Sequence, residues 1–219
     1  MKTLRLAVLI SGRGSNLQAL IDACKKPDYP AEIAVVISNI PDAAGLARAA
    51  AAGLPVAVVD HRDFRKAEGF DKAGFETALA QIAEQHATGL VCLAGFMRIL
   101  GPVFLKRFKD KVINIHPSLL PRHKGLHVHE AVLAAGDTVS GCSVHVVSEG
   151  MDEGPVIDQR AVPVHSGDTP EILAARVLEQ EHVLYPAVVA QIARGDIVIE
   201  GGHITAGRAE KTKNSEKTS

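Results

Sequence analysis

An amide and an imidazole stand two residues apart at the end of an apolar run in KVINIHPSLLP, residues 111–121. Side chains alternate between faces along a β-strand, so Asn114 and His116 would share one face, opposite Ile113 and Ile115. An Asn side chain can stabilise a developing oxyanion, and His can move a proton near neutral pH. The pair indicates a catalytic site at a strand end; the alternative is a structural pair that backbone groups satisfy.

A glycine-containing loop follows the first apolar run, in LISGRGSNLQAL, residues 9–20. Its glycines permit a tight turn around Arg13, and Ser15 or Asn16 stands at the expected N-cap of a helix. The free N–H groups of such a helix favour phosphate. GxxxxGK[ST] is absent, and Leu17 replaces the third glycine of GxGxxG. The loop therefore predicts a monophosphate site, and the alternative is a capped turn that binds nothing.

Three acids lie in a glycine-punctuated turn in SEGMDEGPVID, residues 148–158: Glu149, Asp152 and Glu153. A carboxylate beside an imidazole stabilises the protonated ring and orients it. Solvated surface charges are the alternative. The sequence itself does not show which of the three acids would lie beside the imidazole.

Glu181 falls on the apolar stripe of a long predicted helix, which Leu173, Val177, Leu184 and Val188 form. A carboxylate at such a position needs a partner, which ligand hydroxyls or a protein group can supply. A salt bridge at the edge of the stripe is the alternative.

Three histidines in RHKGLHVHEA, His123, His127 and His129, raise the question of a metal site. The HExxH pattern is absent, and no Cys or acid is spaced as a further ligand. We therefore expect no metal.

The elements that position these residues alternate along the first half of the chain. Short Val-, Ile- and Leu-rich runs separated by stretches of helical period predict a parallel sheet with helices on both faces. After residue 136, SGCSVHVVS and PVIDQRAVPV follow each other without a helix, which predicts an antiparallel addition. A helix over roughly 169–194 and a short strand in DIVIEGGHI complete an open α/β sheet, whose ligands bind beyond the carboxyl ends of the strands.

Composition limits the class of protein. The 219 residues are 47% hydrophobic and 22% charged, which is typical of a soluble globular protein. A net charge of −1 and 4% aromatic residues argue against a nucleic-acid or membrane partner, and no apolar run is long enough to cross a bilayer. Three scattered cysteines without CxxC fit a reducing cytoplasm. We expect one domain over residues 1–209 and a disordered polar tail over 210–219.

Six motifs together resemble, in order, those of the phosphoribosylglycinamide formyltransferase family, the folate-dependent transformylases of purine synthesis: VLISGRGSNLQALIDA, LAGFMRIL, NIHPSLLP, GLHVHEA, SVHVVSEGMDEGPVI and EQEHVLYP. The resemblance runs from about Leu6 to Gly195. It implies a Rossmann-like fold and the transfer of a formyl group from 10-formyltetrahydrofolate, a co-substrate, to the amine of glycinamide ribonucleotide. It implies no metal.

The resemblance also assigns roles to residues. Asn114, His116 and Asp152 would be catalytic, with Asn114 and a protonated His116 stabilising the formyl oxygen. His116, directly or through water organised by Asp152, would carry the proton. The residues implied for the ribonucleotide are Gly14, Ser15 and Asn16, with Glu181 at the ribose hydroxyls. The residues implied for the folate are Lys72, Met97, Arg98, Ile99, Leu100, Asn114, Ser148, Glu149, Gly150, Met151 and Asp152.

Two positions depart from the family pattern. Arg13 replaces a smaller residue in the loop, and an added cation near phosphate should help binding or be neutral. The basic residue that meets the folate aligns with Lys72, but that helix aligns poorly, and Arg62, Arg65 or Lys66 are alternatives.

Other functions on the same scaffold are a formyltetrahydrofolate deformylase, with water as the acceptor, and a non-enzymatic module that binds a phosphate ligand. Methionyl-tRNA formyltransferase shares the Ser-Leu-Leu-Pro stretch but resembles a longer chain with an added RNA-binding domain. We expect small-molecule substrates only, and a monomer or weak homodimer.

Overall fold

The computed structural model describes residues 3–207. A seven-stranded sheet has the order β3-β2-β1-β6-β7-β8-β9. Its first five strands are parallel, and β8 and β9 are added antiparallel. This confirms the predicted open, mostly parallel sheet with an antiparallel addition. The strands are β1 (Leu4–Ile10), β2 (Ala31–Ser38), β3 (Val56–Val58), β6 (Leu90–Leu93), β7 (Val112–His116), β8 (Val139–Val146) and β9 (Val156–Pro163).

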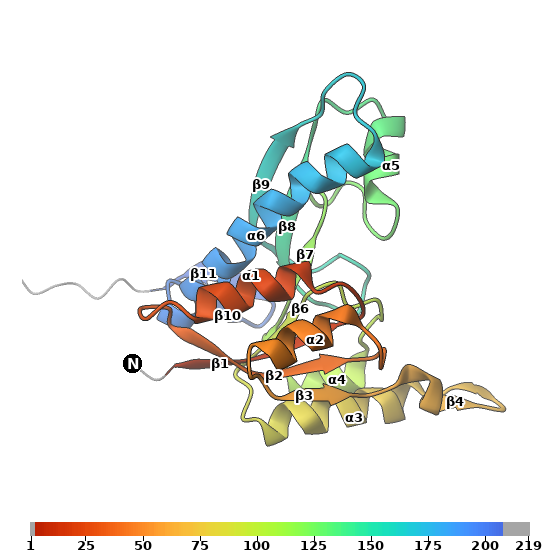
Figure 1. Ribbon diagram of the computed structural model, residues 1–219, viewed down its shortest axis with the longest axis vertical. Coiled ribbons are helices and arrows are strands. Elements are labelled where there is room, and N and C mark those ends of the chain that lie inside the picture. The colour runs from red at the N-terminus through yellow and green to blue at the C-terminus, as the bar shows by residue number, and fades with distance from the viewer. Residues whose placement is uncertain (1–2, 208–219) are drawn as a thin grey trace, which may run out of the picture.

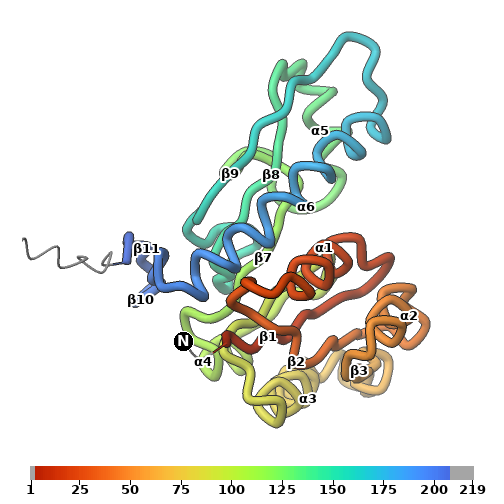
Figure 2. The backbone as a smooth tube through the Cα atoms, turned by 60° about the vertical axis from the view of Figure 1, so that its left-hand side comes forward, coloured from red at the N-terminus to blue at the C-terminus, as the bar shows by residue number. Residues whose placement is uncertain are grey.

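Helices cover both faces of the sheet, as Figures 1 and 2 show. One apolar core lies under α1, α2 and α6, and a second lies under α3 and α4. The helices are α1 (Ser15–Cys24), α2 (Ala44–Ala51), α3 (Lys72–Gln85), α4 (Pro102–Arg107), α5 (Val128–Ala134) and α6 (Pro170–Arg194), with a 3₁₀ turn η1 (His61–Phe64). Nearly every residue of β1 and β2 is buried because both faces of these strands are covered.

The antiparallel strands β8 and β9, together with α5 and the first half of α6, form an arm that extends from the parallel part of the sheet (Figures 1 and 2). Two small hairpins complete the structure: β4 (Arg65–Lys66) with β5 (Gly69–Phe70), and β10 (Ile197–Glu200) with β11 (His203–Ala206). The single strand predicted in DIVIEGGHI is wrong, because Gly201 and Gly202 adopt positive φ and reverse the chain into the second hairpin.

The long helix α6 crosses the sheet and carries Glu181 to the site. Thr169 caps its start, accepting from Ile172 N–H, and Gly195 ends it in the left-handed conformation. One turn beyond Glu181, the buried Tyr185 hydroxyl lies 2.9 Å from Leu93 O and 3.2 Å from Ile113 O. These contacts hold α6 against β6 and β7.

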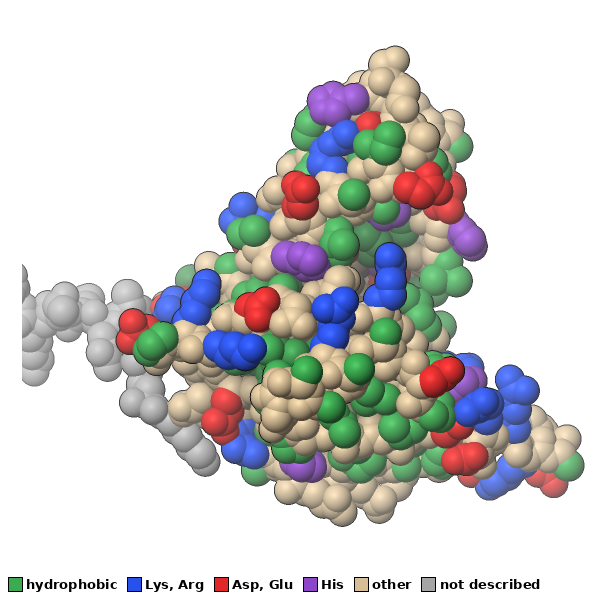
Figure 3. Space-filling model, viewed as in Figure 1, with side chains coloured by type: hydrophobic (Ala, Val, Ile, Leu, Met, Phe, Trp, Pro, Cys, Tyr) green, Lys and Arg blue, Asp and Glu red, His purple; other side chains and the backbone are tan. Residues whose placement is uncertain are grey.

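The described part of the chain contains no helix that is both long and apolar enough to span a bilayer. The predicted polar tail, residues 210–219, lies outside the described residues, so the division at residue 209 stays a prediction. Figure 3 shows Lys, Arg, Asp and Glu side chains interspersed over the face it presents.

Candidate active site

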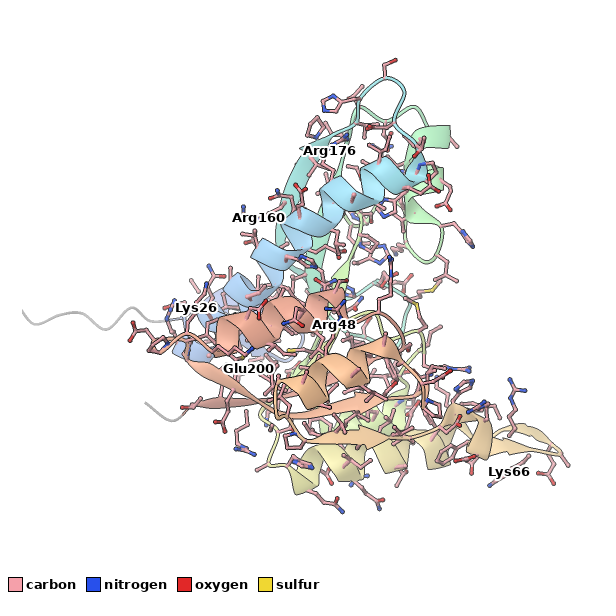
Figure 4. All side chains as sticks on the ribbon, viewed as in Figure 1. Lys26, Arg48, Lys66, Arg160, Arg176 and Glu200 are labelled. Carbon is pink, nitrogen blue, oxygen red and sulfur yellow. The ribbon has the colours of Figure 1, made fainter. Side chains whose placement is uncertain are left out.

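The glycine loop between β1 and α1 packs against the start of α2. A Cβ on Gly14 would lie 2.7 Å from Gly45 Cα, and the φ of Gly14 is +72°, so a larger residue would be strained there. Gly45 N–H donates to Gly12 O (3.0 Å), and Arg48 Nε donates to Arg13 O (2.9 Å). Figure 4 labels Arg48 near the start of α1. These contacts hold the loop as a compact turn at the helix end.

Helix α1 begins without a side-chain cap. The expected cap by Ser15 or Asn16 is wrong, because Gly14 is the N-cap residue and no side chain bonds the first turn. The first N–H groups of a helix have no partner within the helix, and here no cap occupies them. They lie at the positive end of the helix dipole, where an anion binds favourably.

Asn16 and Glu181 form a buried polar pair behind this loop. Asn16 Nδ2 donates to Glu181 Oε2 at 2.8 Å, and the two residues are 9% and 6% exposed. The salt bridge considered from the sequence is not formed within residues 3–207. Burial raises the pKa of Glu181 to about 7, although the Asn16 bond lowers it. Asn16 Oδ1 is buried without a hydrogen-bond partner in the described structure. The pair therefore leaves an acceptor ready for a ligand hydroxyl.

The predicted pair at the end of β7 projects from the face opposite α6. Ile113 and Ile115 belong to the core under that helix, so Asn114 and His116 lie on the other face. His116 Nε2 donates to His123 O at 3.0 Å, since a carbonyl only accepts. His116 Nδ1 lies 3.3 Å from a carboxylate oxygen in the loop between β8 and β9.

That carboxylate belongs to Asp152. Its Oδ2 accepts from Gly125 N–H at 2.9 Å, and its Oδ1 lies 3.5 Å from His145 Nε2. Burial raises the pKa of Asp152, but His145, the Gly125 N–H and His116 together lower it further, and the pKa lies below its usual range. Asp152 is therefore ionised at neutral pH. Its φ of +53° is one that Asp and Asn tolerate better than most residues.

Burial lowers the pKa of His116, and this effect exceeds the opposing effects of the His123 carbonyl and Asp152. The ring is therefore neutral at pH 7, and the protonated His116 assigned from the family resemblance does not describe the ligand-free protein. With a proton on Nε2, the lone pair on Nδ1 faces Asp152. His116 can accept a proton at Nδ1, and both acceptors would then stabilise the imidazolium.

His145 completes the cluster, and the sequence reasoning missed it. β8 pairs antiparallel with β7 in a register that places His145 directly opposite Asn114. His145 Nδ1 donates to Val146 O at 3.0 Å, and its Nε2 lies 3.1 Å from Asn114 Nδ2. The only signal in the sequence was a histidine inside the apolar run CSVHVV. Its meaning depends on the strand register.

The predicted folate segment, Met97 to Leu100, connects β6 to α4. Met97 and Ile99 are 65% and 56% exposed, whereas Leu100 is buried at 2%. The Arg98 guanidinium carbon lies 5.5 Å from the centroid of the Phe70 ring. Exposed apolar side chains beside a polar cluster suit a ligand with an apolar, planar part.

The basic residue predicted to meet the folate, Lys72, is the first residue of α3, and its ammonium lies next to Gly101, just beyond the folate segment. Two of the alternatives, Arg62 and Lys66, form ion pairs with neighbouring aspartates. The third, Arg65, is exposed on the β4–β5 hairpin.

The turn of residues 148–153 directs its three acids to different surroundings. Asp152 faces the histidines, whereas Glu149 is exposed and Glu153 pairs with Lys124 at 3.2 Å. Met151 is 51% exposed and lies against Gly125. The structure therefore brings only Asp152 to the imidazole. The other residues predicted in this turn, Ser148 and Gly150, contact each other weakly, with Ser148 Oγ 3.4 Å from Gly150 O.

These groups share one edge of the sheet. The glycine loop follows β1, the folate segment follows β6, and the catalytic pair ends β7. The three strands are neighbours, so the outer two lie about 10 Å apart. The strand order reverses between β1 and β6, the place where open α/β sheets bind ligands. Within residues 3–207, no three His, Cys, Asp or Glu side chains are grouped to hold a metal ion.

An acyl-transfer site at this edge agrees with the family comparison. The model described as "Formyl transferase" matches residues 4–189, and the chain belongs to this family of transferases.

Particular relatives bear out the resemblance drawn from the six motifs. The chain is 44% identical over 192 residues to phosphoribosylglycinamide formyltransferase of Escherichia coli, with 88% of each chain covered. It is 48% identical over 204 residues to the trifunctional purine biosynthetic protein adenosine-3 of Bos taurus, covering 93% of this chain. The chain spans about 20% of the length of that bovine protein.

Solved structures agree with the fold. Glycinamide ribonucleotide transformylase 1 from Symbiobacterium toebii has a TM-score of 0.87 and 42% identity, covering 94% of this chain and 95% of that one. Phosphoribosylglycinamide formyltransferase from Coxiella burnetii has a TM-score of 0.86 and 42% identity, covering 93% of both chains.

Proposed function

We propose that the protein transfers the formyl group of 10-formyltetrahydrofolate to the primary amine of glycinamide ribonucleotide, in de novo purine biosynthesis. The observation that carries the proposal is the contact of His116 Nδ1 with Asp152 Oδ2, 3.3 Å apart, at the sheet edge that also carries the glycine loop. The names of the bacterial relatives support the choice of substrates.

The ribonucleotide would bind at the glycine loop. Gly14, Ser15 and Asn16 would offer N–H groups to the phosphate at the start of α1, where no side-chain cap competes. The ribose hydroxyls would bond to Glu181 and to the unpartnered Asn16 Oδ1. This satisfies Asn16 Oδ1, a buried atom that otherwise lacks a partner, and gives the buried Glu181 carboxyl group further donors, which favours a ligand with neighbouring hydroxyls.

The folate would bind between β6 and the turn of residues 148–152. Its pterin would lie against that turn, and the exposed side chains of Met97 and Ile99 would cover its apolar surface. Lys72 would meet the glutamate part of the folate, since its ammonium lies beside Gly101 at the end of the segment. Its contact with Glu76 Oε1, at 3.8 Å, is longer than the ion pairs of Arg62 and Lys66, at 2.6 and 2.5 Å. The complete proposed set is Lys72, Met97, Arg98, Ile99, Leu100, Asn114, Ser148, Glu149, Gly150, Met151 and Asp152.

The chemistry begins with attack of the amine nitrogen on the formyl carbon, which forms a C–N bond and places negative charge on the formyl oxygen. The Asn114 amide would donate to that oxygen; loss of one such donor typically costs about 3–4 kcal/mol of barrier. Because the proposal assigns activation of the carbonyl to side chains, it calls for no metal.

The proton then moves from the amine to N10 of the folate, because N10 leaves poorly unless it is protonated. Neutral His116 would accept the proton at Nδ1, directly or through water held by Asp152. The imidazolium, between Asp152 and the His123 carbonyl, would stabilise the oxyanion by its charge. Its Nδ1 proton would pass through water held by Asp152 to N10 as the carbon–N10 bond breaks.

The test is to mix the protein with 10-formyltetrahydrofolate, with and without glycinamide ribonucleotide, and to follow tetrahydrofolate release. Turnover that requires the ribonucleotide supports the proposal. Turnover without it means hydrolysis and a deformylase. Nucleotide binding by calorimetry without folate binding would instead indicate a non-enzymatic module.

We further propose that the protein works in the cytoplasm on small molecules, without nucleic-acid or membrane partners, as a monomer or weak homodimer. The net charge of −1 and the free Cys24, Cys92 and Cys142 support this. Sedimentation equilibrium across a range of concentrations tests the oligomeric state.

A further inference from the structure

The segment Met97 to Leu100 has little apolar anchoring of its own. Two of its four side chains, Met97 and Ile99, are exposed, and only Leu100 is fully buried. It is also preceded by Gly95, whose φ of +71° directs the chain out of β6. A segment with such exposure needs other contacts to keep one conformation.

Ser11 supplies such contacts at the first end. Its hydroxyl oxygen accepts from Met97 N–H at 2.8 Å, and its own N–H donates to Gly95 O at 3.1 Å. The two bonds bracket Phe96, whose side chain is buried in the core under α3 and α4. Ser11 therefore fixes the point at which the segment leaves the sheet.

The Ser11 hydroxyl is itself oriented. Its proton goes to Asn39 Oδ1, 2.5 Å away, at the end of β2. Asn39 is 2% exposed, and its N–H lies 3.4 Å from Ile10 O. Because the only hydroxyl proton is used on Asn39, the oxygen lone pairs remain for the Met97 N–H.

Glu76 holds the second end. Its side chain on α3 is 1% exposed, and Oε1 accepts from Gly101 N–H at 2.6 Å while Oε2 accepts from Phe104 N–H at 3.1 Å. The same carboxylate therefore caps α4 and fixes the residue after Leu100. Lys72 Nζ lies 3.8 Å from Oε1.

We propose that Ser11 and Glu76 are positioning residues that hold the segment Met97–Leu100 from its two ends in the shape that binds the folate co-substrate. The inference rests on the proposed function, because it takes this segment as part of the folate site. Neither residue touches the folate; each acts through a backbone N–H of the segment or its flank, and Glu76 also lies against Lys72.

Ser11 also connects the two halves of the site. It lies directly before Gly12, so the residue that bonds to Gly95 and Met97 also begins the glycine loop. Glu76 has no such connection, since it lies on α3 on the opposite face of the sheet from α1. Glu76 therefore acts on the folate half of the site alone, through the end of the segment and through Lys72. A change at Glu76 should weaken folate binding more selectively than a change at Ser11.

The test compares Ser11→Ala and Glu76→Gln with wild type, with Ser140→Ala as the matched control. Ser140 Oγ is buried on β8 and has no hydrogen-bond partner in the described structure, so its removal deletes a buried hydroxyl without deleting a bond. Steady-state assays give kcat and the KM of each substrate. Titration with tetrahydrofolate gives folate affinity without turnover, and thermal melting reports folding.

Ser11→Ala should raise the KM for 10-formyltetrahydrofolate about threefold to tenfold, the effect of losing the one hydrogen bond that its hydroxyl makes with the segment. Glu76→Gln places an amide N–H group against one of two N–H donors and should raise the folate KM by about tenfold or more, with the ribonucleotide KM within about twofold of wild type. Ser140→Ala should change neither KM.

Folate affinity within twofold of wild type in a folded Ser11→Ala protein would overturn the inference, as would equal weakening of both substrates in folded Glu76→Gln. If Glu76→Gln does not fold, the Ser11→Ala titration decides alone. A wild-type protein that binds tetrahydrofolate but transfers no formyl group contradicts the proposed function instead. The titrations then still test whether Ser11 and Glu76 position the segment.

Discussion

The affinity for the ribonucleotide should rise with pH through neutrality, because Glu181 titrates there. Burial raises its pKa from 4.5 to about 7, and the carboxyl group lies beside the glycine loop through its bond with Asn16. Ribose hydroxyls donate to an ionised carboxylate more strongly than to a carboxylic acid. Binding therefore favours the ionised form, and each bound ligand should release protons from this group.

The magnitude follows from the pKa. With a ligand-free pKa of about 7, roughly a tenth of Glu181 is ionised at pH 6 and roughly nine tenths at pH 8. If the ligand binds only the ionised form, its affinity should increase about tenfold over this range and level off above it. The raised pKa places this rise near neutral pH, because an acid with an ordinary pKa would already be ionised at pH 6.

Calorimetric titration of glycinamide ribonucleotide at pH 6, 7 and 8 measures this dependence, and repeating it in buffers of different ionisation enthalpy counts the protons. The phosphate of the ligand also titrates, with a pKa of about 6. Glu181→Gln is the control, since it keeps the ligand's own titrations and removes that of the protein. Parallel pH profiles in the two proteins would refute the role given to Glu181.

The remaining predictions concern the catalytic cluster and the stability cost of burying Glu181. His116→Ala should lower kcat by at least about a hundredfold, measured by tetrahydrofolate release. In wild type at saturating ribonucleotide, kcat/KM for 10-formyltetrahydrofolate should hold down to about pH 6.5, the usual pKa of a histidine, and fall only below it, because burial lowers the pKa of His116 and the reactive ring is neutral. A fall centred above pH 6.5 would contradict this. Asp152→Asn and Asp152→Ala should each lower kcat by at least about a hundredfold. Of the two new residues, only Asn suits the φ of +53°, so the melting temperature of Asp152→Asn should lie closer to that of wild type. Glu181→Gln should stabilise the ligand-free protein by up to about 3 kcal/mol at pH 8 and by much less near pH 4. The reason is that a carboxyl group of raised pKa destabilises the folded protein as pH rises from 4.5 through about 7. Urea unfolding at both pH values measures this.

The parallel part of the fold was predictable because each strand is a short, nearly continuous apolar run. β1 and β2 are buried on both faces, so each can be recognised as a strand without knowing which strand it pairs with. The end of β7 was predictable for a related reason: Asn114 and His116 break an apolar run at alternate positions, and the period of a strand places them together. These inferences depend on local spacing only.

The helix start and the last hairpin were not predicted correctly because each depends on contacts outside the segment. Gly14 displaces Ser15 as the cap because the loop must approach Gly45 closely. The last hairpin is held at its turn by Asp110, which accepts from Gly201 N–H and Gly202 N–H at 2.8 and 2.9 Å. Asp110 lies 91 residues earlier than Gly201, and nothing in the local pattern indicates it.

The polar partners in the site were the least predictable, because they come from distant segments. Asn16 and Glu181 are separated by 165 residues, and His145 meets Asn114 only through the register of β7 and β8. Asn16, Glu181 and His145 are buried, and Asn16 Oδ1 is left without a hydrogen bond in the described structure. Such groups cost stability unless a ligand satisfies them. A fold that keeps an incompletely bonded amide and a carboxyl group of raised pKa at the tip of α1 gains nothing from them in the ligand-free state. Their presence therefore favours a hydroxyl-bearing ligand at that place over a site that binds phosphate alone.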